Sequence, residues 1–470
     1  MRHFLYVATL LFFQSVFPQT NEQVFFTNGF KIGELTDTSI VLWTRLCKDS
    51  IPVPVHHERK TAPFRHPIDF DEHMPVTQMD GYVGGTFGEV SVLITSKTDT
   101  TYTDWQYVSS YENHTFKKKI TDLRPNTVYS LILKGRKSQG QPITQVQTTF
   151  TTAPDANSIV PVLFTTSTCQ FFWSHDDGVR GYKTYDSMAK LNPLFHCQTG
   201  DYVYYDKPGP MAVTVPLARH KWSAMNSWPS LKHFYTQVPI YMLKDDHDIL
   251  KDDAHYESTP FGELTFKDGL SLWREHVPIL EKPYRTLRWG KDLQIWLVEV
   301  REFRDNNSLE DSAEKTILGS AQKEWLINTM KASDATFKII VSPTPLVGPD
   351  RPKGKNDNHS NASFQTEGIW LRNFLSNQKN TFSINGDRHW QYVSKDTDTG
   401  LMEFSSGAIS DEHAQGWDPD NIQPEHQFLR VKGGFMSVSV KRENQLPIIT
   451  FTHYDVDGNK VNEKVIQAKS

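Results

Sequence analysis

The chain has 470 residues, too many for one ordinary hydrophobic core, so its length predicts two domains. A hydrophobic content of 37% and an aromatic content of 12% exclude a disordered protein. The formal net charge is -5 without a long block of one sign, so the sequence has no nucleic-acid-binding signature and no polybasic membrane surface.

The N-terminus has the pattern of a secretory signal. Met1, Arg2 and His3 form a short basic start, and an apolar run of secretory length follows over residues 4–17. The run is too short to span a bilayer comfortably, and no other segment of the sequence is apolar for long enough. We therefore expect a signal peptide at residues 1–19 and an exported protein, periplasmic or secreted, without a transmembrane segment. A retained N-terminal anchor is the alternative.

Residues 22–153 have the pattern of an all-β domain. Strands are expected at 40–45, 89–95, 128–134 and 145–152, which are rich in apolar and β-branched residues. The segment 123–129 places Pro125 and Asn126 in a turn before Tyr129, and it is similar to a turn of an Ig-like or fibronectin-III-like sandwich.

The insert at residues 48–75 is rich in proline and histidine and predicts a long loop. Four of its side chains could bind a metal ion, but their irregular spacing favours a solvated loop; they are His56, His57, Glu58 and His66.

From residue 159 to residue 470 the pattern is that of an α/β domain, in which helices cover a sheet. Helical spacing occurs at 321–330 and 367–375. Short apolar runs predict strands at 160–166, 195–199, 239–243, 293–300, 337–341 and 381–385. Acidic residues, histidine or cysteine follow several of these runs, and the ends of strands are where such sheets place their sites.

The strongest single cluster is Gly200-Asp201-Tyr202-Val203-Tyr204, directly after one of these runs. The carboxylate of Asp201 could bridge two cations. The phenolate of Tyr204 is a hard anionic ligand that suits ferric iron better than zinc, calcium or magnesium.

Three further clusters follow other runs. Cys169 could bind a metal ion as a thiolate, although a free cysteine is more often buried packing, as we expect for Cys47 and Cys197. The alternation after residue 385 places Asp387 and His389 on the same side of the chain, where they could share a cation pair.

The third cluster, Asp245-Asp246-His247-Asp248 with Asp252 and Asp253, crowds carboxylates that a metal ion or solvent must compensate.

Arg301 and Arg304 follow another strand, at residues 293–300. Their guanidinium groups suit bidentate contact with phosphate or sulfate oxygens, whereas salt bridges to neighbouring acids are the alternative.

Together these blocks resemble the PhoD-like alkaline phosphatase/phosphodiesterase family of calcineurin-like metallophosphoesterases. The resemblance covers nearly the whole mature chain. Its blocks lie at residues 33–45, 167–170, 200–204, 245–248 with 253–254, 301–304, 318–326 and 386–390.

The resemblance implies a layered α/β metallophosphoesterase domain, a β-sandwich flanked by helices, behind an N-terminal all-β Ig-like or fibronectin-III-like domain. It implies Fe3+ and Ca2+ as cofactors. By the same carry-over, Cys169, Asp201 and Tyr204 are iron ligands, with Asp201 bridging, and Asp246 and Asp387 serve the second cation.

The expected catalytic residues are His247, His389 and Arg301, with both histidines near the leaving or attacking oxygen. The expected substrate-binding residues are Arg301, Arg304 and Arg388. Three positions depart from the family pattern. Lys244 stands where tryptophan is frequent, Asp252 where one branch has asparagine, and Glu302 where glutamine is common.

These expectations describe an exported hydrolase that cleaves phosphate monoesters or diesters, small or polymeric, with metal-activated water. One alternative is a sulfatase that uses the same metal site on a polysaccharide, since a sulfate group is isosteric with phosphate. A second alternative is a metal-containing binding protein without catalytic activity, against which the presence of both His247 and His389 argues.

Overall fold

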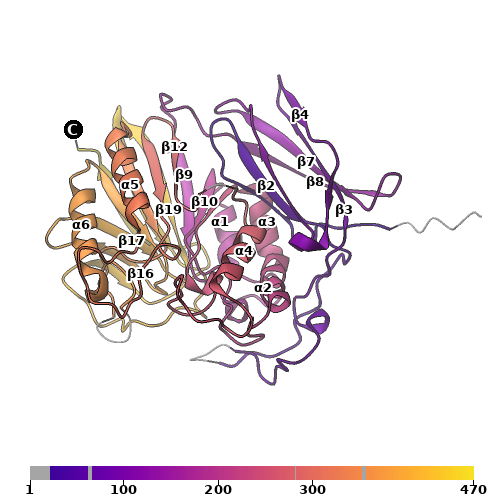
Figure 1. The fold of residues 1–470 in the computed structure, drawn as a ribbon. Helices are drawn as coiled ribbons and strands as arrows, with labels where there is room; N and C mark the ends of the chain where they lie inside the picture. Colours follow the sequence, from indigo (N-terminus) through magenta and orange to yellow (C-terminus); the bar gives the residue numbers. More distant parts are fainter. Residues whose placement is uncertain (1–21, 62–65, 281, 352–355, 470) are drawn as a thin grey trace, which may run out of the picture.

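The computed structural model describes residues 22–61, 66–280, 282–351 and 356–469. Two β-sheets lie face to face in the main body, and helices cover their outer faces (Figure 1). An antiparallel sheet from the N-terminal part of the chain lies at one end. The expected signal peptide at residues 1–19 lies outside the described residues. Within the described ranges, no helix combines the length and the hydropathy that a membrane crossing requires.

The first sheet has nine strands in the order β21-β20-β19-β9-β10-β11-β1-β2-β6. Its central strands β9, β10 and β11 run parallel. In chain order the strands are β1 (Phe30–Gly33), β2 (Ile40–Arg45), β6 (Thr115–Ile120), β9 (Val162–Ser167), β10 (Phe195–Gln198), β11 (Ile240–Met242), β19 (Phe435–Glu443), β20 (Leu446–Tyr454) and β21 (Lys460–Gln467).

The second sheet has seven strands in the order β12-β13-β14-β15-β17-β16-β18, and β13, β14, β15 and β17 run parallel. The strands are β12 (Arg285–Trp289), β13 (Leu293–Leu297), β14 (Phe337–Ser342), β15 (Thr381–Asn385), β16 (Gln391–Lys395), β17 (Met402–Ser406) and β18 (His426–Arg430).

The helices lie on the outer faces of the two sheets (Figure 1). The first group is α1 (Lys183–Ala189), α2 (Val215–Ser227), α3 (Pro229–Gln237) and α4 (Phe266–His276), and the second is α5 (Ser320–Ala332) and α6 (Gln365–Ser376). Strand β11 illustrates the layering, because Ile240 and Met242 pack against the first helices while Tyr241 packs between the sheets. A strand buried on both faces reads as a continuous apolar run, which is why the sequence predicts these strands well.

The N-terminal antiparallel sheet consists of β3 (Gly88–Thr95), β4 (Thr100–Tyr102), β5 (Gln106–Val108), β7 (Val128–Arg136) and β8 (Ile143–Thr151). Tyr129 is buried there, and its hydroxyl accepts the N–H of Arg124 at 2.9 Å, so the turn at 123–129 forms as expected. Strands β1, β2 and β6 of this same part belong to the nine-stranded sheet, through the parallel pairing of Gly33 with Ile240. The boundary between residues 153 and 159 therefore stays a prediction, because one sheet crosses it.

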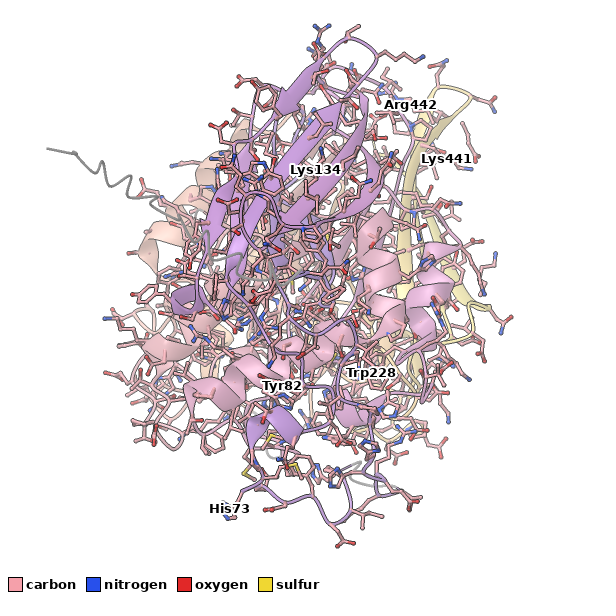
Figure 2. All side chains as sticks on the ribbon, turned by 90° about the vertical axis from the view of Figure 1, so that its right-hand side faces the viewer. His73, Tyr82, Lys134, Trp228, Lys441 and Arg442 are labelled. Atoms are coloured by element: carbon pink, nitrogen blue, oxygen red, sulfur yellow. The ribbon has the colours of Figure 1, made fainter. Side chains whose placement is uncertain are left out.

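The described part of the insert at residues 48–75 forms neither helix nor strand. His73, near the end of the insert, lies at the opposite end of the molecule from Lys134 on β7 of the N-terminal sheet (Figure 2). The carboxylate of Glu72 accepts the N–H groups of Gly209 and Met211, at 2.8 and 2.7 Å, and so attaches the insert to the α/β part of the chain.

Candidate metal centre and active site

The candidate ligands meet where β9, β10 and β11 of one sheet and β15 of the other sheet end. The two sheets approach closely there. A Cβ atom on Gly386 would lie 2.4 Å from the carbonyl oxygen of Thr199 and 2.7 Å from that of Pro343, so the backbone contact requires glycine. The contact brings the block that follows β15 onto the blocks that follow β9 and β10.

Three candidate ligands adopt left-handed backbone conformations. The φ angles are +54° at Cys169, +57° at Asp201 and +62° at Asp387. A residue other than glycine pays a free-energy cost there, and such residues persist where the surrounding structure holds them, often at functional sites. Each forms a sharp turn directly after a strand, which concentrates the side chains at one point.

One group of candidate ligands centres on Asp201 Oδ2. It lies 3.4 Å from Cys169 Sγ and 3.0 Å from the Tyr204 hydroxyl. Ligand atoms of Cys169, Asp201 and His389 lie within 4.8 Å of one another.

Asp201 also belongs to two other groups within the same 4.8 Å limit, one with Asp246 and His247 and one with Asp245 and Asp387. Its carboxylate is therefore central, as a bridging ligand must be. A fourth group combines Asp246 with Asp252 and Asp253.

Asp248, the last residue of the Asp-Asp-His-Asp block, organises the loop that carries Asp201. Its two carboxylate oxygens accept the N–H groups of Asp201, Tyr202 and Val203 at 2.8, 2.7 and 2.9 Å. It also accepts the N–H of Asp245 at 3.0 Å. Asp248 thus shapes the backbone, whereas Asp245, Asp246 and His247 belong to the ligand groups.

The anionic side chains are buried at a high electrostatic cost. Burial, reinforced by the Asp201 carboxylate, raises the pKa of Cys169 and of Tyr204 well above their usual values. Burial also raises the pKa of Asp201 and Asp245. Within the described residues, Asp201 Oδ1 and Asp245 Oδ2 are buried without a hydrogen-bond partner. Unsatisfied oxygens beside a thiol and a phenol fit a multivalent cation, which would compensate all of them.

Comparison with known proteins decides the family. The sequence pattern described as "PhoD-like phosphatase" matches residues 164–432, more than half of the chain. The chain belongs to the PhoD-like phosphatase family. It is 23% identical over 359 residues to "Alkaline phosphatase D" of Bacillus subtilis (strain 168), a match that covers 67% of this chain and 55% of the relative. The chain thus spans about half the length of that relative.

Solved structures confirm the fold class that the sequence predicts. "Structure of PhoD" superposes with a TM-score of 0.70 and 18% identity, covering 94% of this chain and 90% of that one. A purple acid phosphatase, PPD1, from yellow lupin (Lupinus luteus) seeds has a TM-score of 0.62 and 10% identity, covering 93% of this chain and 74% of that one. The PhoD-like chain therefore has the mixed α/β layers of both proteins, with an antiparallel N-terminal sheet.

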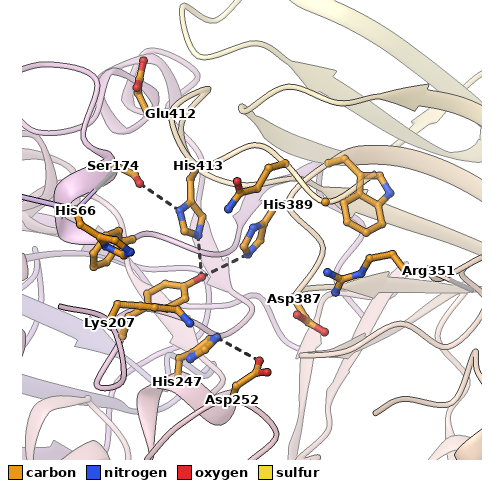
Figure 3. Close-up of a pocket in the computed structure, with 15 residues that line it drawn as sticks. His66, Ser174, Lys207, His247, Asp252, Arg351, Asp387, His389, Glu412 and His413 are labelled. Carbon is orange, nitrogen blue, oxygen red and sulfur yellow. Dashed lines mark hydrogen bonds and ion pairs between the residues drawn. The ribbon is translucent and has the colours of Figure 1, made fainter. Parts of the chain in front are cut away.

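The ligand groups border a cavity of about 430 Å³ (Figure 3). Side chains from distant segments line it, including His66 of the insert, Lys207, His247, Arg351, Asp387, His389 and His413. The insert thus contributes a histidine to the cavity wall, while the N–H groups of His56 and His57 bind Asp80.

The two expected catalytic histidines have different environments. His247 Nδ1 lies 2.7 Å from Asp206 Oδ1. Burial disfavours the imidazolium of His247, but Asp206, Asp246 and Asp201 outweigh it, so its pKa lies well above the usual value. Burial, with His413 and Arg351 nearby, lowers the pKa of His389 well below the usual value. The surroundings therefore favour the protonated form of His247 and the neutral form of His389.

The three arginines expected to bind substrate are fully buried, and none is among the residues that line the cavity. Arg301 pairs with Asp245 and approaches Asp246 at 3.7 Å. Arg304 donates to the carbonyl oxygen of Asp357 at 2.9 Å.

Arg388, the third of them, pairs with Asp387 at 2.6 Å and with Asp357 at 3.3 Å. Arg301 therefore forms salt bridges, but with Asp245 and Asp246 and not with the acids next to it in the sequence, whereas Arg304 donates to a carbonyl oxygen. The reason is that the acids beneath the cavity outnumber the cations there, and they draw the guanidinium groups inward.

Several side chains at the site have no motif in the sequence. Asp206 lies two residues after Tyr204, so the cluster itself could have drawn attention to it. Lys207 and Arg351 present partly exposed cations, with 38% and 31% of the side chain exposed. His413 lies in the loop after β17, where nothing in the local pattern marks a ligand.

Two of the departures from the family pattern compensate each other. Lys244 is 1% exposed, and its ammonium lies 2.7 Å from the carboxylate of Glu302 and also pairs with that of Glu299. Glu299 and Glu302, which compensate its charge, do not line the cavity. The third departure, Asp252, does line the cavity, 3.8 Å from His247 Nε2.

Proposed function

We propose that this PhoD-like chain is a metal-dependent hydrolase of phosphate esters. The observation that carries the proposal is the position of Asp201, whose carboxylate belongs to three ligand groups beside a cavity that His247 and His389 also line. The family supports the reaction class, and the buried carboxylates support the dependence on metal ions.

Cys169, Tyr204 and Asp201 would hold Fe3+, because thiolate and phenolate are anionic ligands that suit a ferric ion. Asp246 and Asp387 would hold Ca2+ together with Asp201, since calcium prefers oxygen ligands. Bound together, the ions would supply an activated water molecule and neutralise the charge of an in-line transition state.

His247 would protonate the oxygen of the leaving group. Asp206 holds Nδ1 at 2.7 Å and so orients the ring, and the side chain lines the cavity. A histidine fixed in this way can deliver its other N–H to the leaving group as a general acid. His389, whose Nε2 atom lies 3.5 Å from the Tyr204 hydroxyl, would orient the phosphate or the attacking water.

Lys207 and Arg351 would bind the substrate in place of the three buried arginines. Figure 3 shows Lys207 and Arg351 on opposite sides of His389. Arginine makes charge-assisted hydrogen bonds to phosphate oxygens, which supply both affinity and orientation.

We propose further that the protein acts outside the cytoplasm. The basic start and the apolar run at residues 4–17 support export, and an exported hydrolase would meet phosphate esters released by other cells.

The test is hydrolysis of p-nitrophenyl phosphate, bis-p-nitrophenyl phosphate and p-nitrophenyl sulfate, with bound metals quantified in the same sample. We expect turnover of a phosphate ester in the presence of iron and calcium. Asp201→Asn should lower kcat/KM by about 100-fold or more and reduce the metal content. Asp334→Asn, at an aspartate that is 82% exposed, is the matched control.

A preference for the sulfate ester would reassign the site to a sulfatase. Bound metal without turnover of any of the three esters would favour the binding-protein alternative. Full activity of Asp201→Asn would refute the site.

A further inference from the structure

His413 contacts a candidate iron ligand although no sequence block contains it. It is 7% exposed, and its Nε2 atom lies 2.9 Å from the Tyr204 hydroxyl oxygen. On the other side of the ring, Nδ1 lies 3.3 Å from Ser174 Oγ. The dashed lines in Figure 3 trace this chain from Ser174 through His413 to the Tyr204 oxygen.

The two side chains are held by the segments that carry them. Ser174 ends a short 3-10 helix, Phe172–Ser174, and its carbonyl oxygen accepts the hydroxyl of Ser410 at 2.6 Å. The N–H of His413 donates to the carbonyl oxygen of Ser410 at 3.2 Å. The loop after β17 is therefore attached to the 3-10 helix at the point where the imidazole lies between Ser174 and Tyr204.

The number of available protons determines the direction of the hydrogen bonds. A tyrosine that binds a metal ion has lost its hydroxyl proton, so its oxygen can only accept hydrogen bonds. A neutral imidazole has one N–H. If Ser174 Oγ–H donates to Nδ1, then Nε2 carries the proton and can donate to the Tyr204 oxygen.

We propose that His413, oriented by Ser174, is a positioning residue that donates a hydrogen bond to the metal-binding oxygen of Tyr204. The hydrogen bond fixes the direction of the phenolate and withdraws electron density from it, so that Tyr204 donates less charge to the ferric ion. Partners of this kind tune the electronic properties of a metal centre through its ligands. The proposal rests on the proposed function, because it requires iron on Tyr204.

The test compares the iron-loaded wild type with His413→Leu, His413→Gln and Ser174→Ala. The readouts are the tyrosinate-to-iron charge-transfer absorption and the phenolate vibrations in its resonance Raman spectrum, which report the Tyr204–iron bond independently of turnover. We expect His413→Leu to shift both signals in the direction of a phenolate that donates more charge to the ferric ion.

The amide N–H of glutamine can replace that of Nε2, so His413→Gln should largely restore the wild-type signals. Ser174→Ala should shift them in the same direction as His413→Leu but by less.

Unchanged absorption and vibrations in both His413→Leu and Ser174→Ala would overturn the proposal. If His413→Leu fails to fold, Ser174→Ala decides, since it removes one hydroxyl from a buried site. Iron without tyrosinate signals in the wild type would overturn the proposal but leave the hydrolase function standing if phosphate esters are still cleaved. Absence of both iron and turnover would refute the proposed function itself.

Discussion

The buried ammonium of Lys244 gives a quantitative test of how this chain tolerates its departures from the family pattern. Lys244 lies between the carboxylates of Glu299 and Glu302, beneath the candidate metal centre. Replacing it by methionine keeps much of the side-chain volume and removes the charge, which leaves two carboxylates facing each other with about 2% and 12% of their side chains exposed.

The magnitude follows from this geometry. Removing one partner of a buried ion pair costs about 3–5 kcal/mol, because the remaining charge is left without compensation. Glu299 keeps the N–H groups of Arg301 and Glu302, at 2.5 and 2.8 Å, and Glu302 keeps the guanidinium of Arg274 at 3.3 Å, which offset part of the cost. We therefore expect Lys244→Met to lower the free energy of unfolding by about 3 kcal/mol.

Glu302→Gln in the Lys244→Met background should recover more than about 1 kcal/mol, because it removes one of the two opposed charges. Equilibrium urea denaturation, followed by tryptophan fluorescence and far-UV circular dichroism, measures both differences. Trp273 is a convenient reporter, since the ammonium of Lys244 lies 4.7 Å from its ring centroid. Lys244→Arg keeps the charge and is the control. A Lys244→Met variant as stable as the wild type, with additive effects in the double variant, would refute the reasoning.

Four further outcomes are expected. Arg351→Ala should lower kcat/KM for a phosphate ester by roughly 10- to 100-fold, the value of a charge-assisted hydrogen bond, with Arg351→Lys in between; equal kinetics in all three proteins would exclude Arg351 from substrate binding. Asp248→Asn replaces a carboxylate that accepts three backbone N–H groups by an amide, whose NH2 group cannot accept them. It should therefore lower the free energy of unfolding, measured by urea denaturation, by about 2–4 kcal/mol. An unchanged midpoint would contradict the role assigned to Asp248. The pKa of Glu367 is lowered to about 2: burial opposes this, but hydrogen bonds from His359 and Thr316 outweigh it. A depressed carboxyl pKa stabilises the folded state above the unfolded pKa near 4.5, so wild-type stability should fall between pH 5 and pH 2 by about 3 kcal/mol relative to Glu367→Gln; parallel pH profiles would refute this. Removing bound metal with a chelator should lower the free energy of unfolding by about 3 kcal/mol, if the free metal had been at 100 times its dissociation constant. The loss is measured as a lower melting temperature that returns when iron and calcium are added. An unchanged melting temperature would argue against a metal centre in the folded protein.

The sequence by itself predicted the strands β9, β10, β11, β13, β14 and β15 and the candidate ligands near their ends, but none of the strands β16 to β21. Parallel strands buried on both faces leave continuous apolar runs in the sequence. The strand expected at residues 381–385 forms β15 with the same bounds, Thr381–Asn385. The candidate ligands Asp201 and Asp387 follow such strands by three and two positions, so a local pattern was enough to find them. The segment 40–45 was equally clear, and it forms β2 (Ile40–Arg45).

Less of the helical layer was visible in the sequence. The expected helices at 321–330 and 367–375 form α5 and α6, whereas α1, α2, α3 and α4 were missed. Helix α2 buries polar residues such as His220 and Asn226 together with Trp222, so its buried face has no clean apolar periodicity.

Only the tertiary structure decided which charges face the cavity and which compensate one another beneath it. Arg301 and Arg388 belong to recognisable blocks, yet they point to buried aspartates, while Arg351 and Lys207 reach the cavity from loops without a motif. His413 meets Tyr204 from a segment 209 residues away in the chain. The physical reason is that periodicity and turn residues act within a segment, whereas the partner of a charge depends on which segments the folded sheets bring together.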